Sequence, residues 1–160
     1  MRKAVWICAA LLVWAGAAQG ADNSFFRILS SKPNATFEDA CKGFAMLAGV
    51  PVTEDFGEFK SQLAARKIIP AKWAEEKTAE ERLTRGVMAY MVCTSLEIKG
   101  GMMMRLLGPS QRYSLRECVY LKLIARSAES KLVTGGELLA VLHRVDKYKR
   151  EHVEGEEVEQ

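Results

Sequence analysis

Apolar residues recur every three to four positions along much of this chain, which is the spacing of one face of an α-helix. In TFEDACKGFAMLAG, residues 36–49, the residues Phe37, Ala40, Cys41 and Phe44 fall on one face. No stretch alternates apolar and polar residues for long, and no Asn-Gly or Asp-Gly hairpin occurs. We therefore predict an all-α fold of about five to six helices, with further helices in residues 53–70, 83–101, 110–127 and 133–150.

Hydroxyl residues mark where several of these helices begin. Thr36 and Thr84 each stand just before an apolar periodic stretch, where a side-chain oxygen can accept from the first free amides of a helix. The pattern of a capping box, Ser or Thr followed three residues later by Glu, occurs twice. We predict boxes from Ser114 to Glu117 and from Thr134 to Glu137.

The segment KGGMMMRLLGPS, residues 99–110, predicts an elbow between two helices. Two glycines end the preceding helix, since glycine accepts the left-handed conformation that follows many helices. The elbow itself is predicted to make one or two turns with three side chains packed inward, those of Met103, Leu106 and Leu107. Arg105 is the exposed polar residue of this elbow. A structural salt bridge is the favoured role for Arg105, and contact with a partner is the alternative.

The threonine-led helices recur at a nearly constant interval. Thr36 to Thr84 is 48 residues, and Thr84 to Thr134 is 50. The helices between them end alike, in LAARKIIP and VYLKLIAR, and a polar connector follows each. A period of this size indicates repeated helix–loop–helix units, and such units bury their apolar faces by packing on one another.

The N-terminal residues have the pattern of a cleaved secretory signal peptide, which we assign to residues 1–20. Arg2 and Lys3 precede an uncharged apolar run, and small residues suited to signal peptidase follow it. That run is shorter than the roughly 20 residues of a spanning helix, so we expect no stable transmembrane segment after cleavage. Beyond it we expect a linker or loosely docked arm at 21–34, one helical domain at 35–150 and a disordered acidic tail at 151–160.

The charge balance argues against nucleic-acid binding. The formal net charge is +3, and it falls to +1 when Arg2 and Lys3 are removed with the signal peptide. Binding to nucleic acid depends on a strongly basic surface that neutralises phosphates. We expect an exported protein that resides in the periplasm, on the cell surface or in the medium.

Three cysteines remain after cleavage: Cys41, Cys93 and Cys118. Each lies in an apolar helical pattern, so one interpretation is that all three are small buried apolar residues. An exported protein also meets an oxidising compartment, which permits a disulfide. The pair that we then favour is Cys93 with Cys118. No CxxC motif occurs and no Cys–His spacing resembles that of a zinc site.

The stretches FKSQLAARKIIPAKW and RLTRGVMAYMVCTSLEIKGG resemble an S-layer homology repeat, and YLKLIARSAESKLVTGGELLAVLHRV resembles a second copy. In that family an isoleucine-containing helix end leads through a polar loop to a threonine-arginine motif that opens the next helix. The resemblance covers about residues 55–148. It implies binding of cell-wall polysaccharide through the arginine of the motif, which in this chain is Arg85.

The methionines suggest an alternative chemistry. Met88, Met91 and Met102–Met104 place five thioethers within 17 positions, and soft thioether ligands favour Cu(I). Consecutive helical residues point about 100° apart, which works against one shared ion at Met102, Met103 and Met104. A periplasmic copper or thiol-redox protein that uses these methionines and the cysteines stays as the second hypothesis.

Catalytic residues are hard to find in the sequence. A serine–histidine–acid triad would need His143 or His152, and the carboxylates Glu117 and Glu137 are better explained as capping residues. An enzyme of unrecognised type is the third hypothesis.

The leading hypothesis is a non-catalytic exported helical module, without a cofactor, that binds or scaffolds a cell-wall polysaccharide or an envelope protein. The sequence does not specify its oligomeric state.

Overall fold

A computed structural model describes the backbone of residues 16–156 and the side chains of residues 24–152. The described part is all-α, as predicted, and contains isolated bridges but no strand. Six of its eight helices are longer than six residues. In chain order the helices are α2 (Gly16–Ser31), α3 (Phe37–Leu47), α4 (Phe56–Ala65), α5 (Ala71–Glu76), α6 (Arg85–Ser95), α7 (Met102–Leu107), α8 (Gln111–Tyr120) and α9 (Gly135–Glu156).

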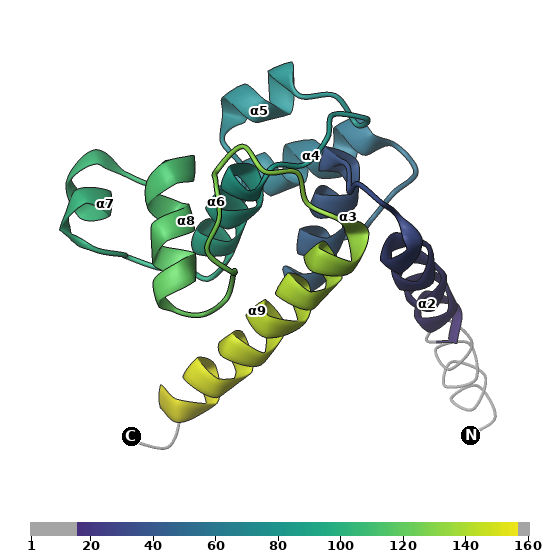
Figure 1. Cartoon of the computed structure of the whole chain (residues 1–160). Helices are drawn as coiled ribbons and strands as arrows, with labels where there is room; N and C mark the ends of the chain where they lie inside the picture. The colour runs from purple at the N-terminus through teal and green to yellow at the C-terminus, as the bar shows by residue number, and fades with distance from the viewer. Residues whose placement is uncertain (1–15, 157–160) are drawn as a thin grey trace.

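The structure corrects the predicted ends of the domain. Where a linker or loose arm was expected at 21–34, α2 extends to Ser31 and buries Leu29 completely. Figure 1 shows that the end of α2 lies beside the start of α9, and the two helices then diverge towards the chain termini. The tail expected to be disordered from 151 is helical as far as Glu156.

The remaining terminal predictions fall outside what the structure describes. The side chains of the predicted signal peptide, residues 1–20, and of its cleavage site are not among the described residues, and neither is the tail beyond residue 156. Across residues 16–156, none of the helices combines the length and the apolar character that crossing a membrane requires.

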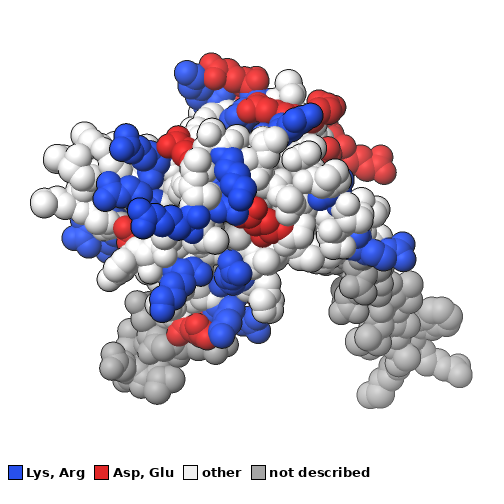
Figure 2. All heavy atoms as spheres, in the orientation of Figure 1, with Lys and Arg blue, Asp and Glu red and all other residues white. Residues whose placement is uncertain are grey.

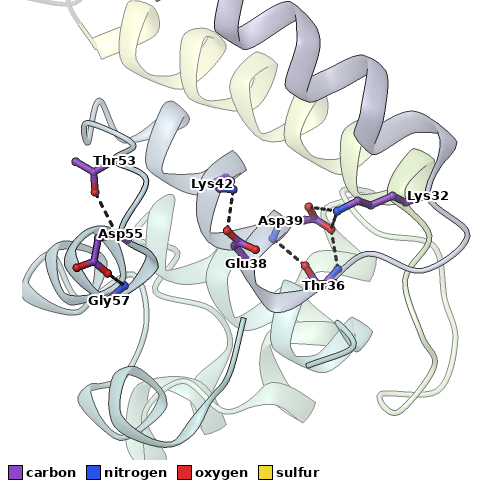
Figure 3. A network of polar contacts seen from close by, with 8 residues as sticks. All are labelled: Lys32, Thr36, Glu38, Asp39, Lys42, Thr53, Asp55 and Gly57. Carbon is purple, nitrogen blue, oxygen red and sulfur yellow. Dashed lines mark hydrogen bonds and ion pairs between the residues drawn. The ribbon is translucent and has the colours of Figure 1, made fainter. Parts of the chain in front are cut away.

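Helix α3 begins with the cap that the sequence predicts, in the form of a full capping box. The Thr36 hydroxyl accepts from the Asp39 amide (3.2 Å), and the Asp39 carboxylate accepts from the Thr36 amide (2.9 Å). Lys32 donates to the same carboxylate at 2.7 Å, so the nearly buried Asp39 is both capped and ion-paired (Figure 3). This cluster ties the segment after α2 to the first turn of α3.

The caps of the later helices are confirmed at two threonines, although the Glu137 carboxylate pairs with Arg85 and does not complete the predicted box at Thr134. The prediction at one serine is wrong. Thr84 accepts from the Val87 amide, and Thr134 accepts from the Glu137 amide (3.1 Å). Helix α8, however, begins at Gln111, and its cap is Ser110, which accepts from the Tyr113 amide. Ser114 is instead a fully buried residue within α8, and its hydroxyl makes no hydrogen bond in the structure.

Substitution of the two serines should therefore have opposite effects. Ser110→Ala is expected to lower the free energy of unfolding by about 1 kcal/mol, because the first turn of α8 loses its cap. Ser114→Ala is expected to be neutral or stabilising, because it removes a buried hydroxyl that lacks a partner. Urea unfolding followed by circular dichroism measures both. If Ser114→Ala lowered the free energy of unfolding more than Ser110→Ala did, the result would support Ser114 as the cap of α8.

Three buried backbone segments form a closed ring of hydrogen bonds at the centre of the fold. The Ala35 amide donates to the Val133 carbonyl (2.8 Å), Leu83 to Ala35 (2.9 Å) and Val133 to Leu83 (3.0 Å). All three residues are at most 1% exposed, and each immediately precedes a threonine cap. The residues after those caps extend the ring with three further bonds, Phe37 to Glu81, Arg85 to Lys131 and Gly135 to Lys32.

Two of the helices that precede these segments also end in the same way. Lys67 follows α4 and Lys122 follows α8, and both adopt φ = 59°. The next amide then donates back to a carbonyl five residues earlier, from Ile68 to Leu63 (3.0 Å) and from Leu123 to Cys118 (2.9 Å). Both turns direct a pair of buried apolar residues into the core.

Gly135 has the tightest surroundings of the described glycines. A Cβ atom added at Gly135 would lie 1.8 Å from the Leu29 carbonyl oxygen of α2. Because no side chain fits there, the first turn of α9 can lie directly on the end of α2. The main core forms around this junction, and its largest fully buried side chains include Phe37, Phe44, Phe59, Leu63, Leu83, Met88, Met91 and Leu138.

Candidate functional site

Helix α7 presents an apolar surface at the edge of the molecule. Its exposed apolar side chains are Met102 (82%), Met103 (48%), Leu106 (77%) and Leu107 (63%), and only Met104 is buried. The prediction that Met103, Leu106 and Leu107 pack inward is therefore wrong. The helix itself lies where the sequence placed it, between Gly101 and Gly108, and Figure 1 shows it projecting beyond α8.

A short contact holds this helix against α8. The Glu117 carboxylate on α8 accepts from the Gly101 amide at 3.3 Å, just before α7 begins. Met104 packs back against Gly100, which has φ = +60° and where a Cβ would lie 2.5 Å from the Met104 sulfur. Glu117 thus anchors the elbow, whereas the sequence had suggested that it caps its own helix.

An open groove of about 980 Å³ lies beside α7. Ile69 and Pro70 line one part of it, from the turn after α4, and Met104 and Pro109 line another. Tyr90 of α6 also lines the groove, and partial burial raises the pKa of its hydroxyl. The groove therefore joins the turn after α4, α6 and the elbow, which lie far apart in the sequence.

Cations border this groove. Lys67, Lys99 and Arg105 all line it and are exposed, and Glu97 is its one acidic lining residue. Within the described part of the chain, none of the three cations forms an ion pair. The salt bridge favoured for Arg105 is thus not present there, and its guanidinium faces solvent next to the apolar side chains of α7.

The basic character extends over the whole α7–α8 region. Residues 98–133 contain seven Lys or Arg residues and two Glu residues, a local net charge of +5 in a chain whose total is +3. A second hollow of about 500 Å³ contains the exposed Tyr120, one acidic residue, Glu129, and three of these arginines: Arg112, Arg116 and Arg126. Figure 2 shows blue side chains gathered over this side, with the white surface of α7 beyond them.

Arg85, the second arginine singled out from the sequence, is not available for a ligand. Its side chain is 8% exposed and forms an ion pair with Glu137 at the start of α9. It also donates to the Ala125 carbonyl (2.9 Å) and to the Ser127 hydroxyl (2.6 Å). The predicted ligand contact at Arg85 is therefore corrected: this arginine fastens the connector before α9 to the starts of α6 and α9.

The methionines do not converge on one point. Met104 is buried against Gly100, while Met102 and Met103 are exposed on the other sides of α7. Met88 and Met91 are fully buried in α6, within the hydrophobic core. A copper site that combined all three methionines of the elbow would require α7 to unwind.

The cysteines fall into two environments. Cys93 and Cys118 face each other between α6 and α8, with their sulfurs 3.6 Å apart and both thiols free. A hydrogen bond from Cys118 lowers the pKa of Cys93, and the same bond, together with burial, raises the pKa of Cys118. Cys41 lies apart in α3, where burial raises its pKa to about 12. Cys93 and Cys118 are thus neighbours, as the favoured pairing requires, but they are not joined by a disulfide in the structure.

The residues considered for catalysis lie in four separate places. His143 is exposed on α9 beside an apolar hollow between α2, α3 and α9. His152 stacks on Tyr148 near the end of α9, with ring centroids 3.8 Å apart. Glu137 is paired with Arg85, and Glu117 holds the elbow. The structure does not bring any of these residues into a common site.

No protein-family model matches the chain, and no curated protein matches its sequence. The main candidate for a functional site is therefore the apolar and basic face formed by α7 and the groove beside it. Arg105 was identified from the sequence, whereas Lys67, Tyr90 and Lys99 were not.

Proposed function

We propose that this protein is an exported, non-catalytic helical module of the cell envelope, and that it binds another protein through α7 and the neighbouring groove. The observation that carries the proposal is the exposure of four large apolar side chains on one six-residue helix. Contiguous apolar surface is uncommon on monomeric soluble proteins and marks interaction sites. Export is supported by the signal-peptide pattern of residues 1–20.

The partner that fits this face presents an apolar patch bordered by carboxylates. Lys67, Lys99 and Arg105 lie around the groove without ion-pair partners in the described residues, so they are available to pair across an interface. Complementary charge of this kind steers association and fixes the orientation of the two proteins. Apolar contact with α7 would then supply most of the binding energy, since interfaces depend on a few buried anchors.

Two other occupants fit this face less well. A second copy of the chain would bring two regions of local charge +5 together, and their repulsion opposes pairing of like faces. A membrane surface would contact the side chains of α7 but would leave the groove of about 980 Å³ unfilled. A protein side chain or loop can fill the groove and contact α7 together.

We also propose that the fold is a threefold repeat of helical hairpins, with α2–α3, α4–α6 and α8–α9 as the three units. The closed ring of Ala35, Leu83 and Val133 supports this, as do the threonine caps and the matching helix ends at Lys67 and Lys122. In this plan α2 completes the first unit. The insertion that carries α7 lies between the second and third units, so it is free to vary without disturbing the ring.

Site-specific photo-crosslinking in the producing cell tests the binding face. A benzophenone amino acid at Leu106 is expected to give an adduct with a second protein, because this side chain is 77% exposed at the centre of the proposed face. Arg105→Glu in the same chain should reduce the adduct at least about tenfold, since charge reversal replaces attraction by repulsion. Sequencing of the adduct should identify a peptide rich in Asp or Glu.

Ile28 provides the matched control position. It is also an exposed apolar residue (57%), but it lies on α2, away from α7 in Figure 1. Equal labelling from Ile28 and Leu106 would show that the contact is not specific to this face. An adduct with lipid only or with a second copy, or retention on purified peptidoglycan that Arg105→Glu and Leu106→Glu leave unchanged, would overturn the proposal.

A further inference from the structure

The contact between Cys93 and Cys118 joins the two helices that support the proposed face. Cys93 lies on α6 and Cys118 on α8, and α6 packs chiefly against α8. Both thiols are at most 1% exposed, and their sulfurs are 3.6 Å apart. Cys93 also lines the groove beside α7, whereas Cys118 does not.

We infer that Cys93 and Cys118 form an oxidisable dithiol, in which Cys93 reacts first with a disulfide-containing oxidant and Cys118 then closes a bond between α6 and α8. The sulfurs are already in contact, so closure needs small side-chain movements and no rearrangement of the helices. This inference concerns the covalent state of the chain and does not depend on the proposed partner.

The surroundings distinguish the roles of the two thiols. A Cys93 thiolate can accept a hydrogen bond from the Cys118 thiol, and this bond lowers the pKa of Cys93. The Cys118 sulfur also lies 3.6 Å from the Ala89 carbonyl, to which its single proton can turn when it does not point to Cys93. The Cys93 thiol lies 3.6 Å from the Ser114 carbonyl, and Cys93 lines the groove whereas Cys118 does not. The attacking thiolate is therefore the one on the groove side.

The reaction is a thiol–disulfide exchange with a small or protein disulfide as oxidant. The Cys93 thiolate attacks one oxidant sulfur, the oxidant S–S bond breaks, and its second sulfur leaves and takes up a proton. Cys118, as it loses its proton, then attacks the Cys93 sulfur of the mixed disulfide and displaces the remaining oxidant sulfur, which also becomes a thiol. The two protein thiols lose two electrons, and the oxidant disulfide gains them.

Cys41 supplies an internal control. It is fully buried in α3, contacts neither of the other two cysteines, and burial raises its pKa to about 12. We therefore expect Cys41 to stay a free thiol under conditions that oxidise the pair. Cys41→Ser should leave the oxidation of Cys93 and Cys118 unchanged.

Titration of thiols in the reduced chain from residue 21 onwards, which lacks Cys8, before and after incubation with oxidised glutathione, tests the inference. The chain should lose two thiols, and trypsin should release peptide 86–99 joined to peptide 117–122. Reduction should lower the melting temperature by about 5–10 °C, since the bond closes a loop between neighbouring helices. Cys118→Ser should trap one glutathione on Cys93, whereas Cys93→Ser should trap none at Cys118.

Three outcomes would overturn the inference. The thiol count could stay constant in native protein while guanidinium-unfolded protein reacts, which would show that the pair is sealed from oxidants. The cross-linked peptides could contain Cys41, which would contradict the contact between α6 and α8. Trapping of glutathione by Cys93→Ser and not by Cys118→Ser would reverse the assigned order of attack.

Discussion

Gly135→Ala is expected to lower the free energy of unfolding by about 3 kcal/mol or more. The new Cβ would lie 1.8 Å from the Leu29 carbonyl oxygen, a distance that no pair of non-bonded atoms tolerates. The obstacle is backbone on α2, so it cannot rotate away as a flexible side chain would. Either α2 and α9 separate or the bond from the Gly135 amide to the Lys32 carbonyl is lost. Urea unfolding followed by circular dichroism gives the loss directly.

Gly136 is the matched control for this substitution. It is the next residue in the first turn of α9, and a Cβ there would meet only the Ser30 carbonyl oxygen at 3.9 Å, an ordinary contact. Gly136→Ala should change the free energy of unfolding by less than about 0.5 kcal/mol or raise it by up to about 1 kcal/mol, because alanine restricts the unfolded chain. Equal losses for both variants would contradict the close approach of α2 and α9.

Arg85→Ala is expected to be the second strongly destabilising change, at about 3–5 kcal/mol. The substitution leaves the half-buried Glu137 carboxylate without its partner and removes the bonds to Ala125 and Ser127. Because these bonds fasten the connector before α9, the loss should appear as lower cooperativity of unfolding as well as a lower midpoint. The measurement is again urea unfolding, with the slope compared between variants.

Arg105→Ala, unlike Arg85→Ala, should leave the stability of the fold almost unchanged. Its side chain is exposed and forms no ion pair in the described residues, so the free energy of unfolding should change by less than about 0.5 kcal/mol. The same variant should weaken binding at the proposed face. A stable Arg85→Ala protein with reduced binding would show instead that Arg85 contacts the partner, as the resemblance to the S-layer homology repeat had suggested.

Much of the fold could be predicted from the sequence because the deciding interactions are local. The cap at Thr36 depends on residues within one helical turn, and so do the caps at Thr84 and Thr134. The spacing of 48 and 50 residues was also visible. Ser114 misled because Glu117 follows it three residues later, as the capping box requires, whereas Tyr113 stands at that position after Ser110, the true cap. Only the tertiary packing shows that Ser114 is buried within the helix.

Helix α2 was missed for a different reason. Residues 21–34, which were expected to form an arm, are mixed in polarity and contain Pro33, so their pattern alone is weak. What stabilises it is contact with the start of α9 more than 100 residues later, through Leu29 and Gly135. A contact of that separation cannot be read from periodicity. The sequence contains the pair Gly135-Gly136, but nothing in it indicates which backbone the pair approaches.

The candidate site was predicted in outline only. The elbow and the exposure of Arg105 followed from two glycines, a proline and one charge in an apolar run. The direction of each apolar side chain depends on where α7 starts, and this start places Met104 inward and Leu106 outward. The groove unites the turn after α4 with residues from α6 and the elbow, a tertiary arrangement that the repeat did not specify.

In the proposed architecture, three helical hairpins close around one backbone ring, and α7 lies outside this ring. Native-state hydrogen exchange tests this most directly. The amides of Ala35, Leu83 and Val133 are expected to exchange only through global unfolding, with the same free energy for all three. The amides of α7 should exchange roughly 1,000-fold faster or more. Rapid exchange at Ala35 while Leu83 and Val133 stay protected would contradict the closed ring.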